Sequence, residues 1–484
     1  MVSVSFALGH RPAIQPRQWQ SRLIQLLRSR VAQPSAAGQD VLIHAGPGAG
    51  KTLGALLGVQ QLLHEGRAQR FVVFCHRTAI AAQWRKAAGR LGLRLDDWSP
   101  DSEATGLLLS YQAAALHRER LEQELHHWHA TPWVAIADEV HHLGVDPDEP
   151  EAAAWGHAFS SLTAGAALRL GLTGTPFRAD QLAFCAARRV QERDGDTWVW
   201  RIVPDLCVEP RQLISAGDVR PLEFRFQDGW VDHARGGEDG AGQPDANQPS
   251  AERSCLSAES RESWRARNLR RAIRLADSSS IAERVLLSAR DRLERVRQDD
   301  PGAGGLVIAR DIAHAKRLAA LLIEQGEQTL LVHSLDPEAE QRLAAFQQGQ
   351  ADWLVSIDMC SEGFDAARLR VVAYLSTVVT RSRFVQAITR AVRLDGGREA
   401  SEPIPRHPSY VFAPADPLLI SHARSWSISE PYLLRDRRPV DEPLTPGGSW
   451  NPSLPMAAVA AGAGAVIAMG GPQLPDFVQQ RRPA

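Results

Sequence analysis

The sequence has few of the features that mark metal-bound, secreted or membrane proteins. Its cysteines are Cys75, Cys185, Cys207, Cys255 and Cys360. None of them forms a C-x-x-C pair, which argues against a zinc site, an iron–sulfur cluster or a disulfide framework and fits a reducing compartment. Residues 1–17 lack the charged start and apolar core of a secretion signal, and the apolar stretch at 456–471 is too short to span a bilayer. These absences predict a cytoplasmic protein without a membrane partner.

An excess of positive charge is also missing. The chain has 55 Lys and Arg against 56 Asp and Glu, with a formal net charge of −1. Bulk charge therefore indicates no nucleic-acid partner, and any basic surface has to be local. What the chain does have is length and apolar content, with 484 residues of which 44% are hydrophobic. This combination predicts two or three domains with substantial cores.

Short apolar runs alternate with helix-like segments in two regions, which is the pattern of α/β domains built on parallel sheets. The strands expected in the first region are 41–44, 71–75, 106–110, 133–137 and 168–173. Those expected in the second region are 305–309, 329–333, 353–357, 371–375 and 410–413. We therefore predict an α/β domain at 1–225, a linker or insertion at 226–280, a second α/β domain at 281–415 and a low-complexity tail at 416–484.

The region between the two domains contains two contrasting segments. Residues 227–254 are rich in Gly, Asp, Asn and Pro, which predicts a mobile loop. The next segment, 261–276, places Trp264 among the arginines Arg265, Arg267, Arg270, Arg271 and Arg274. Arginines interleaved with an aromatic side chain suit a contact with a nucleic-acid strand. The other interpretation is an ordinary amphipathic helix with Leu269, Ile273 and Ala276 facing inward.

The stretch HAGPGAGKT at 44–52 has the composition of a phosphate-binding loop. An apolar run precedes it and a helix-like run follows it, and a strand, a glycine-rich loop and a helix together make an anion site. The cradle consists of Ala45, Gly46, Pro47, Gly48, Ala49, Gly50, Lys51 and Thr52. Lys51 can reach the β- and γ-phosphates of ATP, and the Thr52 hydroxyl can hold Mg²⁺. The simpler alternative is a glycine-rich turn that holds no phosphate.

The stretch WVAIADEVHH at 133–142 supplies the carboxylates that such a cradle needs. An apolar strand ends at Asp138 and Glu139, and catalytic groups in a parallel sheet lie at the carboxyl ends of strands. Asp138 is placed to bind Mg²⁺, directly or through water, and Glu139 is placed to orient and deprotonate an attacking water. With His141 two positions further on, the pattern favours a catalytic strand end over an ordinary exposed acidic one.

These motifs resemble those of superfamily 2 helicases and translocases, of the DEAD/DEAH (DExH) type. Asp138-Glu139-Val140-His141 matches the D-E-x-H motif, and the resemblance covers roughly residues 12–415. The family resemblance implies two tandem RecA-like domains, an adenine-reading Gln20, with Gln18 as the weaker candidate, and hydroxyls at Thr173 and Thr175 that couple the nucleotide to the strand. It also implies nucleic-acid backbone contacts, which we expect near His76, Arg77 and Arg178.

The second region is similar to the later motifs of the same family. Residues 353–375 resemble motif V and contribute Gly363 and Asp365, and FVQAITRAVR at 384–393 resembles motif VI. In motif VI, Gln386, Arg390 and Arg393 match, but Thr389 stands where the family usually has glycine. Guanidinium groups from a second domain stabilise the charge that develops on the γ-phosphate. We expect Arg390 and Arg393 to serve this purpose, with ATP bound between the two domains.

The resemblance implies an ATP-driven helicase or translocase with ATP and Mg²⁺ as cofactors. The sequence of motif V and the segment that leaves the first domain, 214–224, are similar to those of restriction subunits, recombination helicases and phage-type unwinding enzymes. This similarity favours DNA over RNA as the partner. A nucleotide-switched clamp that binds nucleic acid or recruits a partner without unwinding remains the alternative. The tail after about residue 424 offers a place for a protein partner or is a passive end.

Overall fold

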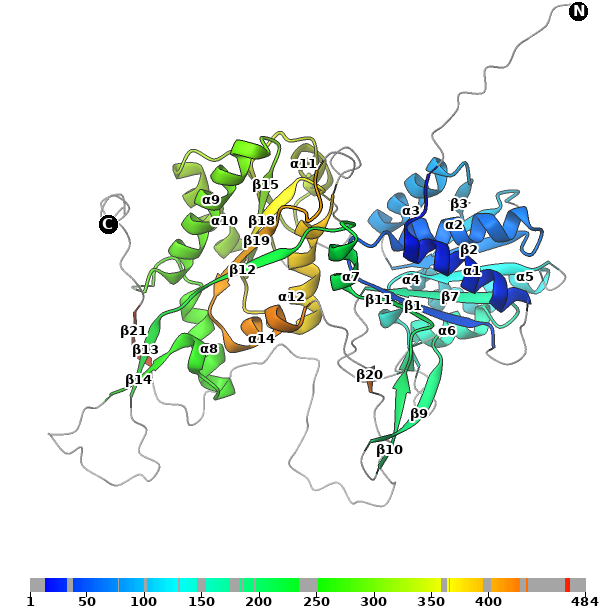
Figure 1. Ribbon diagram of the computed structural model, residues 1–484, viewed down its shortest axis with the longest axis horizontal. Coiled ribbons are helices and arrows are strands. Elements are labelled where there is room, and N and C mark those ends of the chain that lie inside the picture. The colour runs from blue at the N-terminus through cyan, green and yellow to red at the C-terminus, as the bar shows by residue number, and fades with distance from the viewer. Residues whose placement is uncertain are drawn as a thin grey trace, which may run out of the picture. The chain divides into compact units, whose positions relative to one another are not determined.

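The fold is described from a computed structural model, which divides the chain into two compact units. Unit 1 comprises residues 1–45, 50–208 and 431–438, and unit 2 comprises 46–49, 209–430 and 439–484. Within these spans the structure describes residues 14–32, 38–76, 78–99, 102–128, 131–145, 154–174, 183–184, 186–194, 197–234, 251–277, 279–357, 364, 366–394, 402–426, 432–433 and 466–470. Figure 1 shows the helices and strands of both units.

Unit 1 is built on a seven-stranded sheet in which every neighbouring pair is parallel. In the order in which they pair, the strands are β11 (Leu206–Val208), β1 (Asp40–Ala45), β7 (Leu168–Thr173), β5 (Trp133–Ala137), β2 (Arg70–Cys75), β4 (Gly106–Ser110) and β3 (Leu95–Asp97). The central strands β1, β2 and β5 are buried along almost their whole length because helices cover both faces of a parallel sheet. The expected parallel α/β architecture is therefore confirmed for unit 1.

Of the helices of unit 1, the first precedes strand β1 and the others lie in the connections between strands. In chain order, the helices are α1 (Gln18–Ala32), α2 (Lys51–His64), α3 (Thr78–Arg90), α4 (Tyr111–Leu116), α5 (Arg118–His126) and α6 (Ala154–Leu162). Helices α1 and α2 pack closely, and a side chain at Gly58 would come within 2.5 Å of Leu27. Two short strands, β6 (Gly144–Val145) and β8 (Ala183–Phe184), and an antiparallel hairpin, β9 (Arg189–Asp194) and β10 (Thr197–Ile202), complete the unit (Figure 1).

Unit 2 contains a six-stranded sheet that is also parallel throughout. Its strands pair in the order β12 (Leu222–Gln227), β19 (Ser409–Pro414), β18 (Leu369–Leu375), β15 (Gly304–Ala309), β17 (Trp353–Ile357) and β16 (Thr329–Val332). The helices are α7 (Pro210–Ser215), α8 (Glu262–Ala272), α9 (Ile281–Asp299), α10 (Ile312–Glu324), α11 (Ala339–Gln347), α12 (Arg381–Ile388) and α14 (Pro417–Ser425). Two tandem RecA-like units are thus present, as expected.

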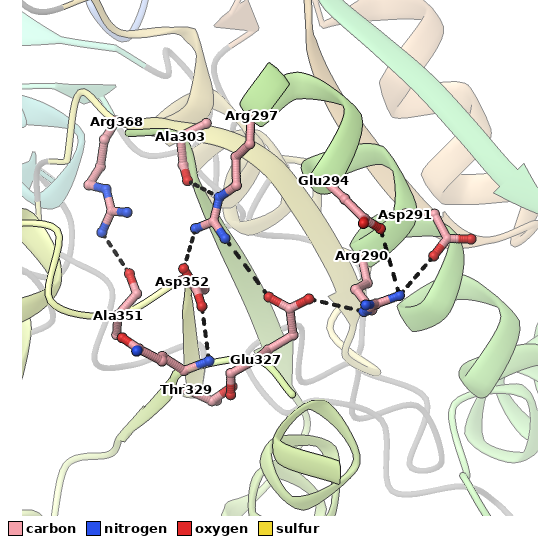
Figure 2. A network of polar contacts seen from close by, with 11 residues as sticks. Arg290, Asp291, Glu294, Arg297, Ala303, Glu327, Thr329, Ala351, Asp352 and Arg368 are labelled. Carbon is pink, nitrogen blue, oxygen red and sulfur yellow. Dashed lines mark hydrogen bonds and ion pairs between the residues drawn. The ribbon is translucent and has the colours of Figure 1, made fainter. Parts of the chain in front are cut away.

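A network of arginines and carboxylates ties helix α9 to the edge of this sheet (Figure 2). Arg290 Nε donates to Glu327 Oε1 at 3.0 Å, and Arg297 Nη2 lies 2.7 Å from Asp352 Oδ1. Asp352 in turn accepts the backbone N–H of Gln328 at 3.0 Å, which joins the starts of β16 and β17. Burial, against the pull of Arg290, raises the pKa of Glu327. These contacts are structural and leave the carboxyl edge of the sheet to the motif residues.

The domain boundaries differ from the predicted ones at three places. Strand β12 begins within the predicted first domain but pairs with β19, so the main span of unit 2 begins at Glu209 and not near 226. The two ends of the loop predicted at 227–254 contribute β13 (Trp230–Ala234) and β14 (Ala251–Cys255), which pair antiparallel, and its residues 235–250 lie outside the described residues. The tail predicted from 416 begins with α14, whose Leu419 is fully buried, and its strand β21 (Val466–Gly470) pairs with β13.

The arginine-rich segment forms helix α8 with an apolar face turned toward the core. Leu269 and Ile273 are buried as the amphipathic interpretation requires, but Ala276 is exposed and Ala272 takes the inward position, because the helix ends at Ala272. Arg265 is 4% exposed, and its Nη1 donates to Asp416 Oδ2 at 2.8 Å. The structure therefore favours a packed helix over a strand-binding one.

Replacing the remaining arginines of this helix together should leave nucleic-acid affinity within about twofold, because a packed structural helix contributes little to backbone contacts. The variant is Arg267→Gln with Arg270→Gln and Arg271→Gln, and the measurement is fluorescence anisotropy of a labelled oligonucleotide. Of these three arginines, Arg271 already donates to Asp277 at 3.1 Å. A loss of affinity of about tenfold or more, with an unchanged melting temperature, would revive the strand-contact interpretation.

Among the described residues no helix combines the length and the apolar character that crossing a bilayer requires.

Candidate nucleotide site

The predicted cradle lies between strand β1 and helix α2, as the sequence indicates. Gly48 and Gly50 adopt left-handed backbone angles, with φ of 78° and 81°, which a residue with a side chain enters only with strain. Gly50 is the N-cap of α2, and because it has no side chain no cap covers the first-turn N–H groups of the helix. An uncapped helix N-terminus after a tight loop is a binding site for an anion such as phosphate.

Lys51 points from the start of α2 toward the end of β5. Its Nζ lies 3.7 Å from Glu139 Oε1 and 3.4 Å from the carbonyl oxygen of Ala45. Glu139 remains accessible, with 28% of its side chain exposed, whereas Lys51 is 13% exposed. The structure therefore brings together the predicted phosphate-binding lysine and the predicted base, which are far apart in the sequence.

Asp138 is held rigidly at the end of β5. It is 8% exposed, its Oδ2 accepts from Trp84 Nε1 at 2.7 Å, and its Oδ1 accepts from the N–H of Glu139 at 3.0 Å. Tyr111 donates its hydroxyl to the carbonyl oxygen of Asp138 at 2.7 Å. Trp84 and Tyr111 are positioning residues that the motif comparison missed. For Trp84 the sequence carries a signal, because residues four apart on a helix share one face and Ile80 and Trp84 of α3 are both buried.

The two carboxyl groups at this strand end have opposite titration behaviour. Burial, followed by the charge of Glu139, raises the pKa of Asp138 to about 6. Burial would also raise the pKa of Glu139, but Lys51, His141 and the N–H of Gly174 outweigh it and lower that pKa well below its usual range. Glu139 is therefore a carboxylate at neutral pH, and a cation near Asp138 would favour its charged form as well.

The backbone at Glu139 supports this assignment. Its φ of 49° is unusual for a residue with a side chain and persists because the surrounding contacts fix it. His141 Nδ1 lies 3.4 Å from Glu139 Oε2 and 3.2 Å from the hydroxyl of the fully buried Thr173. The predicted coupling residues His141 and Thr173 therefore form one contact chain with the predicted base. Thr175, the other predicted coupling residue, lies outside the described residues.

Two histidines border the site from strands of the same sheet. Burial, and then the positive charge of Lys51, lowers the pKa of His44 to about 4, so His44 is neutral at physiological pH. His76, predicted to contact nucleic acid, follows β2 and lies ring to ring with His142 at 4.6 Å. Arg77 and Arg178, predicted for the same surface, lie outside the described residues.

Gln20 lies against the cradle rather than in open space. It is 1% exposed, its Nε2 donates to the carbonyl oxygen of Gly50 at 3.1 Å, and its Oε1 accepts from the N–H of Arg17 at 2.9 Å. Gln18 is exposed. The position of Gln20 favours it over Gln18 as a residue of the nucleotide site, and its role in reading adenine stays a prediction.

The predicted motif VI lies in unit 2, on α12 and the short 3₁₀-helix that follows it (Thr389–Val392). Thr389, which replaces the family's glycine, has a right-handed φ of −76°, and its hydroxyl donates to the carbonyl oxygen of Val385. Threonine is therefore accommodated without backbone strain. Arg390 is 8% exposed and its Nη1 donates to the carbonyl oxygen of Phe364, next to motif V.

The structure describes only some of the other predicted site residues of unit 2. Gln386 and Arg393 are half-buried. The motif V residues Gly363 and Asp365 lie outside the described residues. The roles of Gln386, Arg390 and Arg393 toward a triphosphate remain predictions.

A separate cavity of about 550 Å³ in unit 2 is not this nucleotide site. Arg370 and Tyr410, which line it, stand at the starts of β18 and β19, so the cavity lies at the amino edge of the parallel sheet. Motif residues follow the carboxyl ends of strands, at the opposite edge. Two of its charged side chains, Arg370 and Asp300, already pair with each other at 2.9 Å.

ATP and Mg²⁺ fit the residues of the cradle and of the strand end at Asp138. The left-handed glycines and the uncapped start of α2 fit a triphosphate, and Lys51 fits its terminal phosphates. Among the described residues there is no cluster of three or more His, Cys, Asp or Glu that could hold a metal ion. Mg²⁺ does not need such a cage, because it is usually held by one or two protein oxygens, waters and phosphates. Thr52 and Asp138 are the side chains that would supply those oxygens.

Two family models match the chain. Residues 13–178 match the model described as "Type III restriction enzyme, res subunit", and residues 289–395 match the "Helicase conserved C-terminal domain". The first match contains the cradle and the D-E-x-H motif, and the second contains motifs V and VI. Each match covers the unit in which the sequence places those motifs.

The chain is also similar to mycobacterial proteins along most of its length. It is 32% identical over 437 residues to the uncharacterized protein Rv2917 of Mycobacterium tuberculosis, covering 86% of this chain and 64% of that protein. It is 31% identical over 448 residues to the uncharacterized protein ML1624 of Mycobacterium leprae, covering 88% of this chain and 67% of that protein. The chain thus spans about two thirds of the length of these relatives.

Solved structures share the fold at low sequence identity. A fragment of a putative HsdR subunit of a type I restriction enzyme from Vibrio vulnificus YJ016 matches with a TM-score of 0.53 and 15% identity, covering 87% of this chain and 68% of that one. The ATP-dependent type ISP restriction-modification enzyme LlaBIII bound to DNA matches with a TM-score of 0.51 and 13% identity, covering 86% of this chain and 30% of that one.

Proposed function

Because the chain belongs to the superfamily 2 helicases, in the branch resembling type III restriction subunits, we propose that it is a nucleic-acid-stimulated ATPase that moves along or unwinds DNA. The observation that carries the proposal is the convergence of Lys51 and Glu139, whose charged atoms lie 3.7 Å apart at the carboxyl edge of the first sheet. A phosphate-binding lysine beside an ionised carboxylate is the pairing that hydrolysis of a bound triphosphate requires.

Each residue of unit 1 has a distinct part in the proposed reaction. The cradle and Lys51 bind the phosphates, and Glu139 orients the attacking water and accepts its proton. The water oxygen bonds to the γ-phosphorus while the bond from that phosphorus to the bridging oxygen breaks, which yields ADP and phosphate. Thr52 and Asp138 would hold Mg²⁺, which would neutralise phosphate charge when bound. Glu139, His141 and Thr173 form the contact chain through which the state of the phosphates reaches the strand-binding loops.

Arg390 and Arg393 complete the proposed site from unit 2. Guanidinium groups stabilise the charge that develops on the γ-phosphate oxygens in the transition state. Because these arginines belong to unit 2, hydrolysis is coupled to movement of the units: it removes the phosphate charge that the arginines bind. The domains then separate, and a bound strand is moved or strained. Gln386, on the preceding helix α12, belongs to this proposal, and so do Gly363 and Asp365.

The nucleic-acid partner is proposed to be DNA rather than RNA, bound mainly through its backbone. The family-model match to a restriction subunit supports DNA, as does the fold shared with a restriction enzyme whose structure was solved bound to DNA. His76, Arg77 and Arg178 are proposed to contact phosphates. Such contacts tolerate many sequences and weaken with salt. A cytoplasmic location and a protein partner at the C-terminal end belong to the same proposal.

The test is steady-state ATP hydrolysis by the full chain with Mg²⁺, alone and with a panel of single-stranded DNA, double-stranded DNA and the corresponding RNAs. We expect stimulation of roughly tenfold or more by DNA, falling steeply between 50 and 200 mM salt as the phosphate contacts weaken. Forked substrates then measure unwinding. Hydrolysis that no nucleic acid stimulates, in a protein that binds ATP, would refute the proposal.

The same panel of nucleic acids distinguishes the proposed ATPase from the alternative function, a nucleotide-switched clamp. A clamp would bind DNA more tightly with a non-hydrolysable ATP analogue than with ADP, yet hydrolyse ATP slowly and leave forked substrates intact. The accommodation of Thr389 without strain removes one reason for preferring the clamp.

A further inference from the structure

The hairpin β9–β10 exposes two tryptophans on one surface. Trp198 and Trp200 of β10 are 62% and 47% exposed, although tryptophan usually buries most of its surface. The hairpin projects from unit 1 beside the seven-stranded sheet (Figure 1). Its base is anchored, since Ile202 is 4% exposed and β10 pairs there with the short strand β20 (Tyr432–Leu433).

The strand register places both tryptophans on the same face of the hairpin. Trp198 lies opposite Arg193, Trp200 lies opposite Gln191, and Ile202 lies opposite Arg189. Directly opposite residues of an antiparallel pair share a face, as do residues two apart along a strand. We call this set the tryptophan face, and its members are Arg189, Gln191, Arg193, Trp198, Trp200 and Ile202.

The two faces of the hairpin differ in charge. The tryptophan face combines two aromatic rings with two arginines and one amide and has no carboxylate among its members. The opposite face carries Glu192 and Arg201, which form an ion pair at 3.4 Å. The acidic side chain of Glu192 therefore lies on the face without the tryptophans.

The rings and guanidinium groups of the tryptophan face indicate which kind of ligand binds it. Aromatic rings beside guanidinium groups, on a face whose members include no carboxylate, match the bases and phosphates of a nucleic-acid strand. The rings can stack only on bases whose faces are open, which excludes the interior of an intact duplex. The ring positions two residues apart on one strand provide two adjacent stacking surfaces.

We propose that the tryptophan face of the β9–β10 hairpin binds single-stranded nucleic acid by stacking Trp198 and Trp200 on unpaired bases, with Arg189 and Arg193 beside the phosphates. This inference rests on the proposed function and adds to it a contact with bases, where the motif loops contact only the backbone. It also gives unit 1 a means of distinguishing an unpaired strand from a duplex.

The experiment compares the full-length wild-type protein with the double variant Trp198→Ala, Trp200→Ala. Affinity is measured by fluorescence anisotropy for three labelled probes of equal length, which are oligo(dT), an abasic strand with the same phosphates, and a blunt duplex. The double variant should lose roughly tenfold or more in affinity for oligo(dT), since each stacked base is worth about that much. Its affinities for the abasic strand and the duplex should change by less than about twofold.

Two control variants make the test specific. The variant Trp198→Phe, Trp200→Phe keeps two stacking rings and should retain affinity for oligo(dT) within about threefold, which also covers the case in which the alanine variant folds poorly. Trp230→Ala removes another exposed tryptophan, which is 41% exposed on β13 of unit 2, and should change none of the affinities.

The outcomes distinguish this inference from the proposed function. If the wild type binds the probes and the alanine variant binds oligo(dT) equally well, or loses affinity for all three probes alike, the stacking proposal is overturned while the ATPase proposal stands. If the wild type binds none of the probes, the proposed function fails and the stacking proposal fails with it.

Discussion

Glu139→Gln is expected to lower nucleic-acid-stimulated ATP turnover by at least about 100-fold while the protein still binds ATP. Glutamine keeps the size of the side chain but cannot accept the proton of the attacking water, and general base catalysis contributes roughly 10²–10⁴-fold. Because Lys51, His141 and the N–H of Gly174 keep the pKa of Glu139 low, the base is present over the whole neutral range. The loss should therefore be the same at pH 6.5 and pH 8.

The comparison with Lys51→Ala sharpens this test. Lys51 lies in the cradle, so its removal should abolish turnover and also weaken ATP binding, whereas Glu139→Gln should spare binding. Turnover is followed by phosphate release, and binding by a fluorescent ATP analogue. Glu324→Gln makes the same chemical change at an exposed position on α10 and should be neutral. Substantial turnover by the purified Glu139→Gln protein would overturn the assignment of the base.

Asp416→Ala is expected to destabilise unit 2 by about 3–5 kcal/mol, because it leaves the guanidinium of Arg265 buried without its partner. Asp416 is fully buried and serves two elements with one carboxylate. Its Oδ2 accepts from Arg265 of α8, and its Oδ1 caps α14 by accepting from the N–H of Leu418 at 2.9 Å. Loss of the cap adds about 1 kcal/mol.

Thermal unfolding followed by circular dichroism measures this effect. A loss of this size corresponds to roughly 10 °C in the melting temperature of a domain of about 200 residues. Asp416→Asn keeps an oxygen for the cap and should separate the two contributions. Adding Arg265→Met to Asp416→Asn should recover part of the loss, because no unpaired charge then remains in the interior. A shift of less than about 2 °C for Asp416→Ala would show that the pair contributes little to stability.

The strands and the motif positions were predictable because they depend on local patterns. The strands 106–110, 133–137, 168–173 and 353–357 have the predicted bounds, since each is a short and mostly apolar run. Asp138 and Glu139 were placed at a sheet edge by the strand that precedes them. Lys51 and Glu139 could be expected to meet because the strands that precede them belong to one parallel sheet, whose strands all have their carboxyl ends at the same edge.

The features that escaped prediction depend on residues distant in the sequence. Composition marked 227–254 as a loop, yet β13 within it pairs with β14 and with β21, more than 200 residues further along. The arginines of α8 could be read as a strand-binding set because Asp416, which neutralises Arg265, is not visible in the local pattern. Trp84 supports Asp138 from helix α3; its spacing from Ile80 indicates that it faces inward, but not which residue it contacts.

The pairing of β12 with β19 has a consequence for synthesis of the chain. Strand β12 forms one edge of the second sheet, yet its partner β19 follows almost at the end of that sheet's sequence, with Leu222 opposite Ser409. At typical ribosomal rates the intervening segment takes roughly 10–40 s to emerge. During that interval β12 has no neighbour to hydrogen-bond, and an unpaired strand is a site at which nascent chains associate with one another. Release of the finished polypeptide in a native form therefore depends on keeping this one strand apart from other copies until the last strand of the sheet arrives.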